Sequence, residues 1–168
     1  MMLSMYQASV PVFIRMLNNL SAILDKTIAH AAARKIDPAV LLGARLYPDM
    51  LPLGKQIQIA ADFAKGTAAR LAAVEVPKYE DKEADFADYQ ARIGKTLAFL
   101  QTLDAKQIDG SEDREISITV AGSPMSFKGM PYLLDFALPN FYFHAVTAYD
   151  ILRHNGVELG KRDFIGAA

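Results

Sequence analysis

Apolar residues recur at alternating three- and four-residue steps through much of the chain, which is the spacing of one face of an α-helix. This pattern predicts a first long helix over 4–34, a second over 53–73 and a third over 86–103. A last long helix should begin near Pro131 and stop at Asn155-Gly156, because glycine favours the position just beyond a helix end.

Two prolines fall inside these helical patterns. Pro11 either kinks the first helix or occupies the first position of a helix capped by Ser9. Pro139 has no N–H and should kink the last helix, leaving the carbonyl of Asp135 unpaired. A kink of this kind either opens room between helices or merely bends the helix around its neighbours, and both interpretations stay open.

Two shorter features interrupt the helices. Asp37 followed by Pro38 is a good cap and first residue, and predicts a short helix to about Leu42. Residues 114–129, "REISITVAGSPMSFKG", alternate around a Gly-Ser-Pro turn and predict a small β-hairpin, which must lie against the helices to be stable. The sequence therefore predicts an all-α fold in one domain over 1–168: a four-helix bundle with a small β-hairpin before the last helix. The long segments before the second helix and before the last helix leave room for crossover connections.

Composition narrows the possible functions. The chain has 168 residues, is 52% hydrophobic and carries a formal net charge of −1, which suits one compact core and argues against nucleic-acid binding. Cysteine is absent, so a metal would need His, carboxylate or amide ligands. The chain shows neither a secretory leader nor an apolar run of about 18 residues, so we expect a cytoplasmic protein without a membrane span. Asp81, Glu83 and Asp85 are interpreted as a solvated charge run.

The last helix carries the candidate chemistry. Asn140 and His144 are four residues apart, so they share one helix face at a separation of about 6 Å along the axis and could share one ion or ligand. The alternative is ordinary packing, with His144 as a core imidazole bonded to a carbonyl or a tyrosine hydroxyl. Tyr142 is a further pocket candidate, although it and Tyr149 are equally interpreted as packing or dimer-interface residues. We expect the side chains of Asn140 and His144 to converge on a hollow at the centre of the four helices.

Three stretches carry a resemblance that covers almost the full length. "SMYQASVPVFIRMLNNLSAILDK", "PDMLPLGKQIQIAADFAKG" and "LPNFYFHAVTAYDILRHNGVELGKRDFIG" resemble a bacterial family of unknown function within the DinB/YfiT-like superfamily. The resemblance implies an up-down-down-up bundle that forms a homodimer. It also implies a divalent metal, often nickel or zinc, bound by one histidine of the second helix and two of the last helix. Some members of the superfamily are thiol-dependent transferases or hydrolases.

The resemblance places Asn140 at the first of the two last-helix histidine positions and His144 at the second. The second helix has no histidine; Gln56 is the polar residue that could best face the same pocket, with Asp49 and Asp62 as weaker candidates. Amide oxygens are poor partners for nickel or zinc, so a metal held by His144 and Asn140 should bind weakly.

Three hypotheses follow. The first is a DinB-like protein with a degenerate metal pocket, lined by Asn140, His144, Gln56 and Tyr142, that binds a small molecule or acts as an accessory protein. The second is a metal-dependent transferase or hydrolase, in which a carboxylate or amide of the second helix completes the ion site. The third is a purely structural or partner-binding dimeric bundle.

Overall fold

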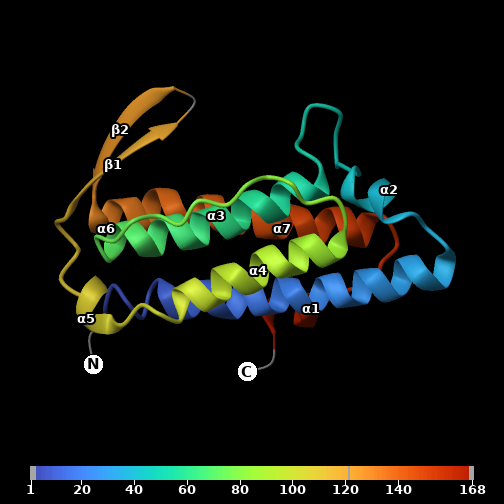
Figure 1. Ribbon diagram of the computed structural model, residues 1–168, viewed down its shortest axis with the longest axis horizontal. Helices are drawn as coiled ribbons and strands as arrows, with labels where there is room; N and C mark the ends of the chain where they lie inside the picture. The colour runs from blue at the N-terminus through green and yellow to red at the C-terminus, as the bar shows by residue number, and fades with distance from the viewer. Residues whose placement is uncertain (1–2, 121, 167–168) are drawn as a thin grey trace.

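The computed structural model describes residues 3–120 and 122–166, and its four long helices lie side by side (Figure 1). Each buries the apolar stripe seen in the sequence; α1, for example, buries Phe13, Leu17, Leu20 and Leu24. The long helices are α1 (Val10–Arg34), α3 (Leu53–Leu71), α4 (Phe86–Leu100) and α7 (Leu138–His154). The short helices are α2 (Pro38–Leu42), α5 (Ala105–Ile108), α6 (Gly129–Pro131) and α8 (Lys161–Ile165), and a π-helical segment, η1 (Tyr132–Ala137), precedes α7.

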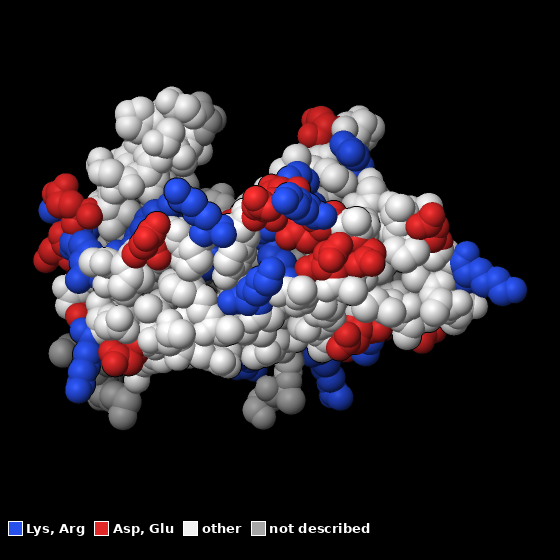
Figure 2. All heavy atoms as spheres, viewed as in Figure 1, with Lys and Arg blue, Asp and Glu red and all other residues white. Residues whose placement is uncertain are grey.

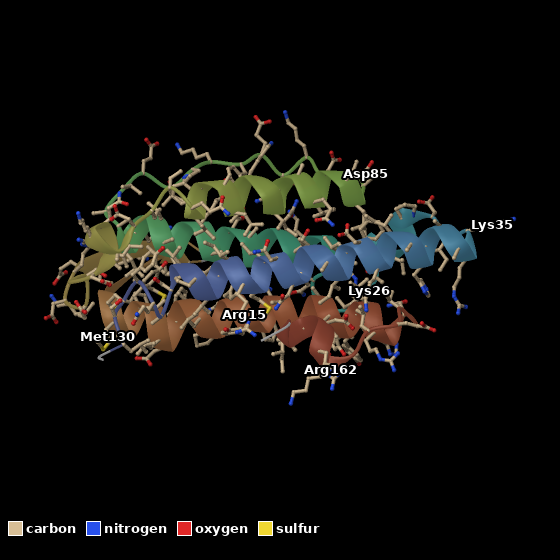
Figure 3. The ribbon with its side chains drawn as sticks, turned by 90° about the horizontal axis from the view of Figure 1, so that it is seen from below. Arg15, Lys26, Lys35, Asp85, Met130 and Arg162 are labelled. Carbon is tan, nitrogen blue, oxygen red and sulfur yellow. The ribbon has the colours of Figure 1, made fainter. Side chains whose placement is uncertain are left out.

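The helices run up-down-down-up, as expected. In Figure 3, Asp85, which caps the start of α4, lies at the same end of the bundle as Lys35, which follows the last residue of α1. Met130 lies at the opposite end, where the last helix begins. The helix α3 packs between α4 and α7, and α1 packs against both of these helices. Within the described residues, every helix is too short or too polar to cross a lipid bilayer.

The crossover connection lies between α3 and α4. Residues 72–85 run back along the length of the bundle so that α4 can start beside the start of α3 (Figure 1). The 19 residues of α3 span about 28 Å, and the extended connection can reach roughly 45 Å. The sequence pattern indicated room for a crossover only in the other two connections, whereas the up-down-down-up order implied by the resemblance requires a crossover here.

Ion pairs hold the crossover segment against α3 and α4. The Arg92 side chain is only 2% exposed; its Nη1 lies 2.7 Å from Glu83 Oε1 and its Nη2 lies 2.9 Å from Asp62 Oδ1. Burial by itself raises the pKa of Glu83. Hydrogen bonds from Arg92 and Gln58 more than offset this effect, so the pKa of Glu83 lies below its usual value. The predicted solvated charge run is therefore wrong for Glu83. Figure 2 shows the resulting cluster of both signs of charge over this face.

The first two helix starts were partly predictable. The helix α1 starts at Val10 with Pro11 in its first turn, although the Ser9 hydroxyl donates back to the Met5 carbonyl and does not cap the helix. Asp37 caps α2 as predicted, because its carboxylate accepts from the backbone N–H of Ala39.

The hairpin is anchored at one end only. Strand β1 (Glu115–Val120) pairs antiparallel with β2 (Ser123–Lys128), and Ile116 and Phe127 face each other near its base. Ile116 is buried, and the Phe127 ring packs on the rings of Tyr132 and Phe136 at centroid distances of 5.8 Å and 5.2 Å. The far end stands away from the bundle as a lobe without charged residues (Figures 1 and 2).

The last helix starts against a backbone carbonyl. A Cβ added at Gly129 would lie 1.9 Å from the carbonyl oxygen of Ser111, so only glycine fits there. A π-helical segment lies between Gly129 and Pro139. At its end, the Leu138 N–H donates to the Leu133 carbonyl five residues back. This wider turn was not predicted; the sequence indicated only a kink.

Candidate functional site

A buried amide of α3 and an imidazole of α7 form one hydrogen-bonded pair. Gln56 is 1% exposed, and its Nε2 donates to the Leu51 carbonyl at 2.9 Å. This bond fixes the orientation of the amide, so that Gln56 Oε1 is the atom 2.6 Å from His144 Nδ1. Since a carbonyl oxygen only accepts, the proton of neutral His144 lies on Nδ1, and Nε2 carries the lone pair. The structure thus brings together two of the residues that the sequence singled out.

The surroundings of His144 keep it uncharged. The side chain is half-buried, and this burial lowers the pKa of His144 from its usual value. The Phe63 ring of α3 stacks on the imidazole at a centroid distance of 6.1 Å, and Phe143 meets it edge-on at 5.2 Å. Apolar neighbours of this kind favour the neutral form at pH 7.

Asn140 and His144 do not converge on a hollow at the centre of the bundle, so that expectation is wrong. At this level of the bundle, α7 buries the apolar side chains of Phe141 and Ala145, each one position further along the chain. Asn140 and His144 lie beside that stripe and remain partly exposed. The Asn140 amide Nδ2 donates to the Phe136 carbonyl at 2.7 Å, so this nitrogen is engaged by the backbone of η1.

Tyr142 lies away from the other three candidates. It is 36% exposed, packs edge-on against Phe141 and lines a separate hollow with Val12 of α1 and Phe164 of α8. Burial raises the pKa of Tyr142, which makes it a poorer acid than a free phenol. The expected pocket of Asn140, His144, Gln56 and Tyr142 is therefore corrected: Tyr142 belongs to another face, and of the four residues only Asn140 lines the hollow between the bundle and the hairpin.

The donor atoms near His144 do not fit a nickel or zinc ion. Gln56 Oε1 already accepts from His144 Nδ1, and Asn140 contributes at most a neutral amide oxygen. In the part of the chain that the structure describes, no group of three or more His, Cys, Asp or Glu residues is arranged to hold an ion. Of the atoms contributed by Gln56, Asn140 and His144, only Nε2 of the imidazole offers a lone pair suited to these metals.

A hollow of about 380 Å³ lies beside Asn140, between the bundle and the hairpin. Its walls are mainly apolar: α3 contributes Ile59 and Phe63, η1 contributes Phe136, and β1 contributes Ile118 and Val120. The Phe63 and Phe136 rings touch at a centroid distance of 5.9 Å and form a continuous aromatic surface. This volume falls within the range of small-molecule sites, about 300–1,000 Å³.

A few polar groups reach the same hollow. Asn140 lines it from α7, Asp62 and Arg70 line it from α3, and Tyr132 lines it from η1. Arg70 Nη1 lies 3.3 Å from the Tyr132 hydroxyl. Apolar walls with a small number of convergent polar groups are the usual make-up of a ligand site.

Fold and site together define a class of protein, a four-helix bundle with a hairpin before its last helix and a hollow beneath that hairpin. A DinB family member protein from Shewanella denitrificans, known from its crystal structure, has a similar fold: it is 40% identical, with a TM-score of 0.88, and the match covers 97% of this chain and 92% of that chain. The family model for a domain of unknown function, DUF1993, matches residues 5–165, so this chain belongs to the DUF1993 family. The resemblance to a family of unknown function within the DinB-like superfamily is thereby confirmed. None of the curated proteins matches the chain.

Most of the hollow was not predicted from the sequence. Asp62 was named only as a weaker candidate, and Arg70, Tyr132 and Phe136 were not named. One signal was available: the hairpin carries no charge between Glu115 and Lys128, which indicates an apolar surface that something could cover.

Proposed function

We propose that this protein binds a small molecule with an apolar body in the hollow between the hairpin and the bundle. The observation that carries the proposal is the aromatic and aliphatic wall contributed by Phe63, Phe136 and Ile118 from three separate elements, with Asn140 and Arg70 at its edge. Binding a ligand against such a wall removes apolar surface from water, which stabilises the complex by roughly 25 cal/mol per Å² of buried apolar surface. Binding alone needs no chemical step.

Titration with octan-1-ol, followed by amide chemical shifts, tests this proposal. Saturable shifts should map to Ile118, Phe136 and their neighbours. In the variant Val120→Trp, the indole fills the hollow from the 40%-exposed position of Val120, and the shifts should be lost. The matched control is Ser126→Trp on the second strand, which adds the same side chain to the hairpin outside the hollow. Equal binding by both variants, or no saturable shift in the natural protein, would refute the proposal.

The metal-dependent transferase or hydrolase is the less favoured alternative, because only one nitrogen ligand is in place at His144. Elemental analysis of protein purified without a chelating tag separates it from ligand binding. A stoichiometric metal that is lost in His144→Ala would favour the enzyme, whereas a trace content that added nickel or zinc does not raise would favour ligand binding without a metal.

The exposed apolar side chains of α7 support a homodimer as a further proposal. Phe143 is 56% exposed and Val146, three residues on, is 39% exposed on the same face. In a two-fold dimer, the same helix of a second copy would cover this pair. Sedimentation at tens of micromolar should give a dimer that Phe143→Glu dissociates. The control Val40→Glu, at a 63%-exposed position of α2, should leave the mass unchanged, and a monomeric natural protein would overturn the proposal.

A further inference from the structure

The guanidinium of Arg70 is held in place at the edge of the hollow. Arg70 lies in the last turn of α3, and its side chain passes over Gly66 one turn earlier, where an added Cβ would be 2.6 Å from Nη1. The same Nη1 lies 3.3 Å from the Tyr132 hydroxyl. Tyr132 is 1% exposed and its ring stacks on that of Phe136, so the hydroxyl is itself fixed. The cation is therefore positioned before any ligand arrives.

The other charges around this site are already balanced. Asp62 is the carboxylate that lines the same hollow, and its Oδ1 lies 2.6 Å from Lys65 Nζ and 2.9 Å from Arg92 Nη2. Among the described residues, Arg70 has a hydrogen bond to the Tyr132 hydroxyl and no ion pair with a carboxylate. A guanidinium has five N–H donors, so most of those on Arg70 are left for a ligand.

The wall beside Arg70 is apolar and uncharged. Ile118 and Val120 of the hairpin lobe face Phe63 and Phe136 across the hollow, and Figure 2 shows no charge on that lobe. A ligand that fits both features has an anionic group for the guanidinium and a hydrocarbon or aromatic body for the wall. The fork of N–H donors in arginine matches the two oxygens of a carboxylate.

We infer that the ligand of this hollow is a monoanionic carboxylic acid with an apolar body, bound through Arg70; this inference rests on the proposed function. A carboxylate is favoured over a phosphate monoester because one guanidinium supplies one unbalanced positive charge.

Three probes that share an eight-carbon alkyl group and differ in their head group test whether the hollow prefers a carboxylate. Octanoate, octan-1-ol and octyl phosphate are each titrated into the full-length protein by calorimetry. Octanoate should bind at least about tenfold more tightly than octan-1-ol, because a hydrogen-bonded charge pair replaces a neutral contact. Its affinity should fall when potassium chloride is added, while that of octan-1-ol should not. Octyl phosphate should bind no more tightly than octanoate.

The variant Arg70→Gln should bind octanoate and octan-1-ol equally, and Arg70→Lys should keep part of the preference. The matched control Lys55→Gln removes a cation of the same helix that pairs with Asp81 outside the hollow, and it should leave the preference intact. Equal affinities for octanoate and octan-1-ol in the natural protein would overturn the inference while the proposed function stands. Tighter binding of octyl phosphate would also overturn it, as would a preference that persists in Arg70→Gln. Binding of none of the probes would overturn both proposals. Because the salt dependence is measured on the natural protein, the test does not depend on the variants folding.

Discussion

Replacing His144 by phenylalanine should destabilise the protein, although phenylalanine suits the aromatic surroundings. The imidazole donates its Nδ1 proton to Gln56 Oε1 across the contact between α3 and α7. Gln56 is 1% exposed, so water cannot replace the lost donor. The substitution His144→Phe would leave this buried carbonyl oxygen without a partner, while a phenyl ring could keep the stack on Phe63.

The magnitude follows from the desolvation of that oxygen. A buried acceptor left without its partner costs about 1–3 kcal/mol in unfolding free energy, more than the net worth of an ordinary hydrogen bond. Replacing both partners by apolar groups of similar shape is nearly neutral. The double variant Gln56→Met/His144→Phe should therefore regain most of the loss, since the Leu51 carbonyl that Gln56 also binds belongs to a partly exposed residue and can turn to water.

Urea unfolding of the natural protein, both single variants and the double variant gives the coupling energy directly. We expect His144→Phe to lower the midpoint without changing the slope, and the double variant to recover. A midpoint for His144→Phe equal to or above that of the natural protein would show that the pair contributes nothing. His144 would then be an ordinary packing residue that an aromatic side chain can replace without loss of stability.

Three further outcomes are expected. Arg92→Met should cost about 3 kcal/mol of unfolding free energy, at the low end for a broken buried ion pair, because Glu83 stays buried while Asp62 can turn to water. A loss below about 1 kcal/mol in urea unfolding would contradict the role of Arg92 in holding the crossover. Gly129→Ala should cost about 1–3 kcal/mol by calorimetry, because the Ser111 carbonyl cannot move aside freely, and an unchanged melting temperature would refute the close approach. The folded-state pKa of His144 lies below its unfolded value, so the unfolded chain takes up the proton first and stability should fall as the pH drops below about 6.5. That fall should be smaller in His144→Phe, and parallel stability curves for the two proteins would contradict it.

The long helices could be predicted because each repeats one buried stripe, and helical periodicity depends only on local spacing. The helix α3 was predicted over 53–73 and is found at Leu53–Leu71, and the hairpin lies where its alternation placed it. The crossover could not be predicted in the same way, since residues 72–85 show no periodicity. Their course depends on Arg92 meeting Glu83 across separate elements.

The resemblance predicted that Gln56 and His144 face the same pocket, and the structure brings the two side chains together, but the hydrogen bond between them was not predicted. The hollow beneath the hairpin was not predicted, since its position depends on how Phe127 packs against η1, a contact that no local pattern encodes. The wider π-helical turn before Pro139 was not predicted either, because a proline in a helical pattern indicates only a kink.

The most direct measurement of ligand binding at the hollow is a crystal structure of the protein with 8-bromooctanoate, with the bromine located by its anomalous signal. A ligand site here requires the bromine peak between Ile118 and Phe136, with the carboxylate about 3 Å from the guanidinium of Arg70. A bromine peak elsewhere on the molecule, with Arg70 turned to solvent and the hollow empty, would contradict it.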